Sequence, residues 1–277
     1  MVILRSSMLL AIALGLPAAA CSKQTQETPA TLASDRAPAP TIAVPWQAAT
    51  AAPGGARNDK QSTELFEFEY SYPAAAGAIP KLKAELDADL AKQKAALAAS
   101  AKEQQAESKK QGFPFNPLGN WTAWKVVTDL PGWLSLSADI SDYSGGAHPN
   151  HGVDALVWDR KADQRRAPLD LFTSKEALSR AIRTDFCAAL NKQRAGKRGA
   201  PIPVGSTDEF DQCIDPVAAT VILGSSNRNG FDRIGILVGP YQAGPYVEGD
   251  YEVTLPVTDA VLATVKPEYR SAFAAKR

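Results

Sequence analysis

The stretch from Leu65 to Tyr72 constrains the fold more than any other, because aromatic and polar side chains alternate along it. One face of an extended chain would carry four aromatic rings, those of Phe66, Phe68, Tyr70 and Tyr72. The opposite face would carry Glu67, Glu69 and Ser71. Alternation with a period of two residues predicts a half-buried strand, and Pro73 ends it.

A long helix is predicted directly after this strand, from Ile79 to about Lys110, where Ala, Lys, Glu and Gln dominate. Pro80 suits the first turn of a helix. Leucines recur every four residues and form one apolar stripe, which consists of Leu82, Leu86 and Leu90. We interpret this segment as a surface helix lying on a sheet rather than as a coiled-coil partner helix.

The rest of the chain mixes strand-like and helix-like segments without a regular βαβ order. Further strands are predicted at residues 122–128, 132–143, 153–158, 219–223, 231–238 and 251–255, and a short helix near 259–264. Thr173 and Glu176 have the spacing of a capping box, which would start a second main helix with a buried face of Leu178, Ile182, Phe186 and Leu190. Residues 194–199 are expected to form a basic loop in solvent. This order predicts an α+β fold with a mostly antiparallel sheet and two main helices.

The first 21 residues have the pattern of an export signal. Arg5 supplies a positive charge, residues 8–16 form an apolar run too short to span a bilayer, and small residues precede Cys21. This arrangement resembles a bacterial lipoprotein leader, in which the cysteine is lipidated with acyl chains such as palmitate. An ordinary secretory peptidase would also accept Ala18-Ala19-Ala20 and would leave a free thiol. We expect an exported protein, lipid-anchored to the cell envelope; Ser22 is compatible with an outer membrane, facing the periplasm, in a Gram-negative cell.

Residues 22–60 are expected to form a disordered tether, because they are rich in Pro and Ala and carry too little apolar surface to offset the entropy of ordering. About 215 residues remain for folded structure, enough for one large or two small domains. Lipid on Cys21 is the expected contact with the membrane. If Cys21 is modified, Cys187 and Cys213 are left to form a disulfide, although two buried thiols are the alternative.

The charge balance argues against a nucleic-acid partner. The chain has 30 Lys and Arg against 30 Asp and Glu, so its formal net charge is zero. Binding to phosphates would require a clustered excess of basic residues. The nucleophile-elbow pattern, the phosphate loop and the dinucleotide fingerprint are all absent from the sequence, so we expect no cofactor and assign no catalytic residue.

Two motifs carry a family resemblance. The first is residues 143–149 (YSGGAHP) with residues 168–172 (PLDLF), and the second is residues 240–249 (PYQAGPYVEG) with residues 251–256 (YEVTLP). In this order and spacing they resemble the extracytoplasmic domain of unknown function that the lysozyme-sensing anti-sigma-V factor shares with some peptidoglycan deacetylases. The preceding segment is similar to the small domain that comes before it in those proteins. The resemblance implies a small α+β domain at residues 61–142 and a second at 143–277.

The resemblance does not imply that this chain has the activity of those proteins. The sigma-binding segment and membrane helix of the anti-sigma factor have no counterpart in the sequence, and neither has the metal-binding catalytic domain of the deacetylases. We therefore expect a tethered envelope domain that is more simply a binding module than an enzyme.

The first candidate site is the turn after the strand that ends at Tyr143. Gly145 and Gly146 would supply the positive φ angles of a hairpin turn, and His148 would bond to the turn or line a cleft. His148 and His151 are the two histidines of the chain. A metal site needs three or four converging ligands, and the intervening Pro149-Asn150 breaks helical geometry, so we expect no metal.

The second candidate site is the loop that contains Tyr241, Tyr246 and Glu248. Aromatic rings beside a carboxylate suit stacking on sugar rings or anchoring a protein interface. A loop that merely covers the edge of the core is the alternative. Asp154 and Glu248 are one possible carboxylate pair for glycoside hydrolysis, but a sequence does not set their separation.

Together these features predict an envelope lipoprotein that binds peptidoglycan or a lysozyme-like protein in a cleft between the 145–148 turn and the 241–249 loop. A hydrolase of cell-wall glycans, with its site near His148, is an alternative. A structural accessory of an envelope complex is the third.

Overall fold

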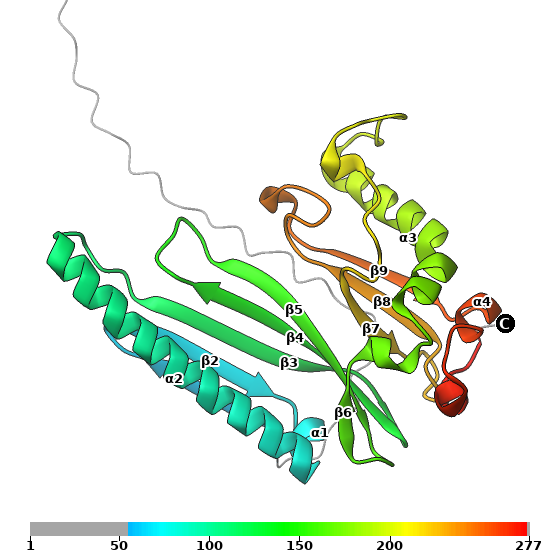
Figure 1. Cartoon of the computed structure of the whole chain (residues 1–277), viewed down its shortest axis with the longest axis horizontal. Helices are drawn as coiled ribbons and strands as arrows, with labels where there is room; N and C mark the ends of the chain where they lie inside the picture. The colour runs from blue at the N-terminus through cyan, green and yellow to red at the C-terminus, as the bar shows by residue number, and fades with distance from the viewer. Residues whose placement is uncertain (1–54, 276–277) are drawn as a thin grey trace, which may run out of the picture. The chain divides into compact units, whose positions relative to one another are not determined.

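The computed structural model describes residues 55–275, coloured in Figure 1. The predicted leader, Cys21 and most of the predicted tether lie outside the described residues. Within that range the prediction of an α+β fold with mostly antiparallel sheets and two main helices is confirmed.

A six-stranded sheet, here called the first sheet, contains β1 to β6 in sequence order. Its strands are β1 (Arg57–Ser62), β2 (Phe66–Tyr72), β3 (Leu118–Leu130), β4 (Trp133–Tyr143), β5 (Asn150–Asp159) and β6 (Gln164–Arg166). Neighbouring strands are antiparallel except β2 and β3, which are parallel. A parallel pair needs a crossover connection, and the long helix between these strands provides it.

The first strand corrects the predicted end of the tether. Residues 57–60 were expected to belong to the tether, but β1 pairs with β2 over its whole length, from Arg57 opposite Tyr72 to Ser62 opposite Glu67. Its charged side chains form ion pairs instead of packing into a core. The Asp59 carboxylate accepts from Lys94 at 2.8 Å, and Arg57 contacts Asp87 at 3.3 Å. Hydrophobic periodicity is therefore a poor guide to an edge strand of this kind.

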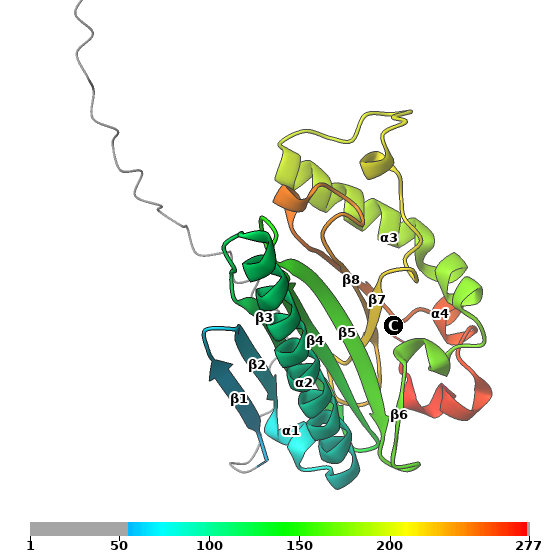
Figure 2. The same ribbon diagram turned by 60° about the vertical axis from the view of Figure 1, so that its left-hand side comes forward.

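The long helix α2 (Pro80–Gln111) covers one face of the first sheet, as Figure 2 shows. The short α1 (Ala74–Gly77) precedes it. The predicted stripe of Leu82, Leu86 and Leu90 is buried against the aromatic face of β2, so this prediction is confirmed. The Tyr70 hydroxyl donates to Asp89 of α2 at 2.9 Å and accepts from the Trp124 indole at 3.0 Å. These bonds satisfy the polar atoms of two buried aromatic side chains.

A three-stranded antiparallel sheet, the second sheet, contains β7 (Thr220–Gly224), β8 (Arg233–Val238) and β9 (Tyr251–Pro256). It packs against α3 (Lys175–Arg198), whose predicted apolar stripe is buried. The short α4 (Asp259–Leu262) lies near the end of the chain. The capping prediction is off by one residue: Ser174, not Thr173, is the N-cap, and its hydroxyl accepts from the Ala177 amide at 3.1 Å.

The prediction that residues 194–199 form a basic loop in solvent is wrong, because most of this segment is helical and one of its arginines is buried. Residues 194–198 continue α3, which ends at Gly199 in a left-handed conformation with φ +70°. Arg194 is completely buried rather than solvated. The helix continues because its inward face finds polar acceptors in two loops, which only the tertiary structure brings there.

The second sheet covers part of the first-sheet face that points away from α2. Alternation along β5 separates the two faces: Leu156 and Trp158 belong to the core under α2, whereas Ala155 packs with Ile222 of β7. The Thr220 hydroxyl also donates to the Val153 carbonyl of β5 at 3.0 Å. The rest of this face, towards β2 and β3, is left open by the second sheet, and we call it the open face.

The predicted boundary between residues 142 and 143 falls inside β4, one residue before its end, and the first sheet continues across it to Arg166. All described residues belong to one compact unit. The predicted disulfide is present, since Cys187 of α3 is bonded to Cys213 with a Cα–Cα distance of 5.5 Å.

Candidate functional site

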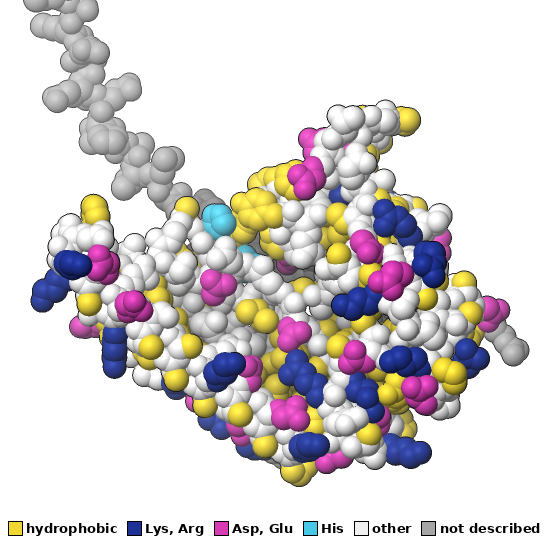
Figure 3. Space-filling model, in the orientation of Figure 1, with side chains coloured by type: hydrophobic (Ala, Val, Ile, Leu, Met, Phe, Trp, Pro, Cys, Tyr) yellow, Lys and Arg dark blue, Asp and Glu magenta, His cyan; other side chains and the backbone are white. Residues whose placement is uncertain are grey.

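The two loops singled out in the sequence lie against each other. The Tyr246 ring, in the loop between β8 and β9, stacks on the His148 ring with centroids 4.0 Å apart and an interplanar angle of 25°. The Tyr246 hydroxyl donates to the Pro149 carbonyl at 3.1 Å. This contact joins the 240–250 loop to the β4–β5 hairpin, and Figure 3 shows histidine atoms beside a hydrophobic group at this place.

Two further rings extend this contact on either side of Tyr246. The His151 ring lies 6.1 Å from the Tyr246 ring, and the Tyr241 ring lies 5.6 Å from it. Tyr241 is 59% exposed, so most of its ring is available to a partner. Packing of a ring on the core edge, the alternative weighed above, therefore does not describe Tyr241.

Two glycines were predicted to have positive φ angles in the hairpin turn, and one of them does. Gly145 adopts φ +93°, a conformation that favours glycine, whereas Gly146 does not have a positive φ. Gln104 of α2 donates to the Ser144 carbonyl at 3.1 Å, which ties the turn to the helix. Tyr143 ends β4, opposite Gly119 of β3.

Glu248 faces away from the rings. Its carboxylate accepts from Arg198 at 2.8 and 3.1 Å and from the Tyr251 hydroxyl, and the side chain is 12% exposed. Burial would raise the pKa of Glu248, but the hydrogen bonds from Arg198 and Tyr251 outweigh it and hold the pKa below its ordinary value. Glu248 therefore stabilises the loop through its contacts with Arg198 and Tyr251.

A buried arginine cluster, which the sequence pattern did not reveal, fixes this loop from behind. Arg194 donates to the carbonyls of Ala243 at 2.8 Å and Gln212 at 3.0 Å. Arg198 pairs with both Glu248 and Asp211, the latter at 2.5 Å. The sequence did contain a sign of this arrangement. Arg194 and Arg198 continue the four-residue spacing of Leu190, which places them on the buried face of the helix, but their charge favoured the interpretation that they lie in solvent.

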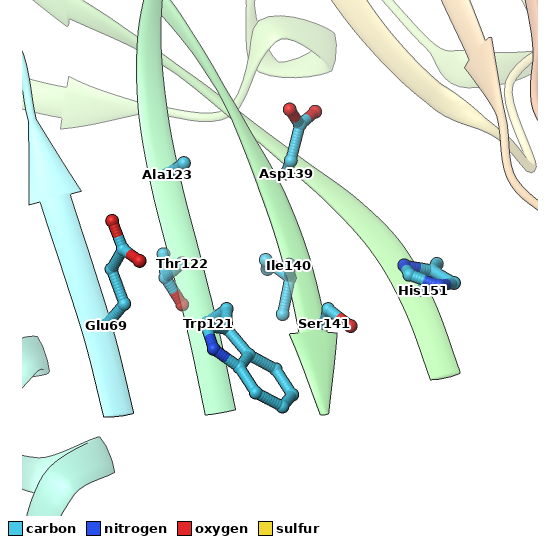
Figure 4. Close-up of a pocket in the computed structure, with 8 residues that line it drawn as sticks. All are labelled: Glu69, Trp121, Thr122, Ala123, Asp139, Ile140, Ser141 and His151. Atoms are coloured by element: carbon cyan, nitrogen blue, oxygen red, sulfur yellow. The ribbon is translucent and has the colours of Figure 1, made fainter. Parts of the chain in front are cut away.

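A shallow depression of 210 Å³ lies on the first sheet next to His151. Its lining consists of Glu69, Trp121, Thr122, Ala123, Asp139, Ile140, Ser141 and His151. Thr122 and Tyr70 bond to side chains of α2, so their neighbours Trp121 and Glu69 point to the open face. Figure 4 shows Trp121, Ser141 and His151 side by side on β3, β4 and β5.

Gly119 lets the Trp121 indole lie against the sheet. A Cβ atom on Gly119 would overlap the six-membered ring of that indole, which occupies the place of the missing side chain. The ring is thus held by the sheet on one side, and Trp121 is only partly buried. Sequence analysis missed Trp121, because one tryptophan in a strand carries no functional signature.

Four rings therefore follow one another from the first sheet to the 240–250 loop, and we call them the aromatic row: Trp121, His151, Tyr246 and Tyr241. The register places Trp121 opposite Ser141 and Ser141 opposite His151, so the first two rings start from positions two strand spacings apart, about 10 Å. Tyr246 and Tyr241 follow at the ring separations given above. The row begins on the open face and ends on the loop of the second sheet.

Ionisable groups near the row are mostly paired. Asp139 pairs with Lys125 across the sheet, and Glu69 pairs with Lys60 at 2.9 Å. Asp154, the other half of the suggested hydrolytic pair, contacts Arg165 at 3.3 Å. Among residues 55–275, no group of three or more His, Cys, Asp or Glu side chains is arranged to hold a metal ion. In the same range, no helix is long and apolar enough to cross a membrane.

Comparison with known proteins gives two kinds of similarity. Residues 59–151, about a third of the chain, match the family model described as "Deacetylase PdaC". The match runs from β1 to the start of β5 and contains Trp121 and both histidines. No curated protein matches the chain.

Among solved structures, the fold is similar to that of a DUF3298 family member from Bacteroides fragilis, with a TM-score of 0.50, 13% identity, and coverage of 78% of this chain and 94% of that one. A DUF3298 family protein from Pseudomonas aeruginosa PAO1 has a TM-score of 0.49 and 16% identity over 80% of this chain and 95% of that one. The likeness to the Bacteroides fragilis structure shows a shared fold, and the predicted resemblance to a domain of unknown function is confirmed in this coarser form.

Proposed function

We propose that this protein is an exported cell-envelope domain that binds a glycan chain of the cell wall along the aromatic row. The observation that carries the proposal is the row itself, in which Tyr241 and His151 are exposed and Trp121 and Tyr246 are partly buried. Sugar rings have apolar faces that pack on aromatic rings, while their hydroxyl groups need hydrogen-bond partners at the side.

The polar groups beside the row suit this role. Ser141 lies between Trp121 and His151 in the sheet register, and Asp139 lies two residues away on the same strand face. A hydroxyl, an imidazole and a carboxylate can donate to or accept from sugar hydroxyls at the edge of a stacked ring. A mostly apolar surface with a few placed polar groups is the usual chemistry of a small-ligand site.

The pair of carboxylates suggested for hydrolysis, Asp154 and Glu248, does not suit that role. A glycosidase needs two carboxyl groups that flank the bond, one of which must hold a proton. Asp154 and Glu248 are both engaged with arginines, and the pKa of Glu248 is lowered rather than raised. A paired carboxylate of this kind is a poor general acid.

The envelope location rests on the leader and on Cys21. In the Cys21→Ser variant we expect the protein to move from the membrane fraction to the soluble exported fraction, measured by fractionation and immunoblotting. A variant that stayed with the membrane would contradict lipidation of Cys21.

The binding proposal is tested with the exported Cys21→Ser protein. We expect it to sediment with purified peptidoglycan and to bind soluble N-acetylglucosamine oligomers in a calorimetric titration. Trp121→Ala should weaken binding about tenfold, equivalent to about 1.4 kcal/mol. Phe113→Ala is the control, because Phe113 is an exposed aromatic residue (66%) that follows α2, outside the row.

A protein ligand is the competing outcome. Binding to a C-type lysozyme at micromolar affinity, with no binding to peptidoglycan or to oligomers, would overturn the glycan proposal and favour a lysozyme-like partner. Binding to wall that is equal in wild type and Trp121→Ala would remove the aromatic row from the site.

A further inference from the structure

We propose that Tyr241 forms a distal subsite of the row, so that the protein recognises several linked sugars rather than one; this inference rests on the proposed function. The first observation is the backbone of Tyr241. Its φ is +64°, the left-handed region, where an L-amino acid with a side chain is strained and glycine is not. Such outliers persist where the surroundings impose them, and they gather at binding sites.

The second observation is that packing does not explain the tyrosine. Its ring is 59% exposed and lies 5.6 Å from the ring of Tyr246, itself a member of the row. The turn that holds it closes through its neighbours, because the Gly239 amide donates to the Gln242 side chain at 3.2 Å and the Gln242 amide to the Gly239 carbonyl at 3.3 Å. Glycine at position 241 would satisfy the same turn with less strain.

The third observation is that hydrogen bonds from α3 hold the loop at several points that follow Tyr241. Fully buried Arg194 donates to the Ala243 carbonyl at 2.8 Å, two residues beyond Tyr241. Lys197 donates to the carbonyls of Glu248 at 2.6 Å and Asp250 at 2.5 Å. A ring presented by a fixed loop costs little entropy when a ligand binds, which is the property expected of a binding platform.

The length of the row sets the size of the ligand. Two strand spacings separate Trp121 from His151, and ring separations of 6.1 and 5.6 Å lead on through Tyr246 to Tyr241. Added along the row, these steps amount to roughly 20 Å, the upper limit of its end-to-end span and more than a single sugar ring covers. A monosaccharide or disaccharide can occupy only part of it, whereas a chain of several sugars reaches both ends.

The test compares an N-acetylglucosamine dimer with the hexamer by calorimetric titration, using the exported Cys21→Ser protein. We expect the hexamer to bind at least about tenfold more tightly than the dimer. Tyr241→Gly should lose most of that advantage, about tenfold for the hexamer, with little change for the dimer. Tyr241→Phe should keep it, because the ring is retained.

Arg228→Gly is the matched control, since Arg228 also has a positive φ, +62°, and lies in the turn at the other end of β8. It should leave both affinities unchanged. We expect the melting temperature of Tyr241→Gly to stay within about 2 °C of the parent protein, because relief of strain offsets the greater freedom of the unfolded chain.

The outcomes separate the two proposals. Absence of binding to any oligomer would overturn the proposed function, and this inference with it. Binding in which dimer and hexamer are equal, or in which Tyr241→Gly keeps the hexamer advantage, would overturn the distal subsite alone. A fall of more than about 5 °C in the melting temperature of Tyr241→Gly would show that the ring is structural.

Discussion

Arg194 offers the sharpest test of how this fold is held together. The side chain is completely buried in the last turns of α3 and makes four hydrogen bonds. Its partners are the carbonyls of Ala243, Gln212 and Asp211 at 2.8, 3.0 and 3.4 Å and the Asn191 side chain at 3.0 Å. Three of these partners belong to loops far away in sequence, so one guanidinium joins the helix to both loops.

We expect Arg194→Met to destabilise the protein by about 3–5 kcal/mol. Each carbonyl left buried without a donor costs about 1–3 kcal/mol, and removal of one partner of a buried charged network typically costs about 3–5 kcal/mol. Methionine keeps the apolar stem and so limits the cavity. For a unit of this size, each kcal/mol lowers the melting temperature by about 2–4 °C, which gives a fall of roughly 10 °C.

The assay is urea unfolding followed by tryptophan fluorescence and by circular dichroism, with agreement of the two probes as the check on two-state behaviour. Lys192→Met is the matched control, because Lys192 lies two residues away on the exposed face of α3 and should change stability by less than about 0.5 kcal/mol. A loss below about 1 kcal/mol for Arg194→Met would refute the argument, since it would mean that water or other donors replace the guanidinium.

Three other contacts in the structure lead to further predictions. Replacing Cys187 and Cys213 together by serine should cost about 3 kcal/mol in urea unfolding, because the disulfide closes a loop with a sequence separation of 26; an unchanged unfolding midpoint would contradict this. The pKa of Glu248 is lowered in the folded protein, so its contribution to stability is complete above the ordinary value of 4.5 and is lost as the pH falls through the folded-state pKa. Glu248→Gln should accordingly flatten the acid side of a stability-against-pH curve, and an unaltered slope would count against the ion pair. Gly119→Ala should displace the Trp121 indole, lower glycan affinity towards that of Trp121→Ala and change the tryptophan emission; a spectrum and affinity like the wild type would show that the ring has room to move.

Much of the fold was predictable because its signals are local. The aromatic alternation of β2 and the leucine stripe of α2 each depend on a repeat that the burial of one face imposes. The failures have equally clear causes. β1 is a charged edge strand without an apolar face, and the N-cap was assigned to Thr173 because two adjacent hydroxyl residues, Thr173 and Ser174, can both serve.

The site was predictable only in part. The sequence singled out Tyr241 and Tyr246, which belong to the aromatic row, and His148, whose ring stacks on that of Tyr246. It assigned Glu248 to the same surface, whereas the carboxylate points inward to Arg198. Trp121 escaped notice, since its importance comes from its neighbours across the sheet.

The sequence by itself determined the mostly antiparallel α+β class and the two main helices, and it favoured the disulfide between Cys187 and Cys213, because each depends on a short-range pattern or on a small count of residues. Only the tertiary structure decided which face of the first sheet stays open, where Arg194 is buried, and that Tyr246 meets Pro149 across 97 residues of sequence. The physical reason is that these features arise from contacts between distant segments, whose energies depend on packing and register that no local pattern contains.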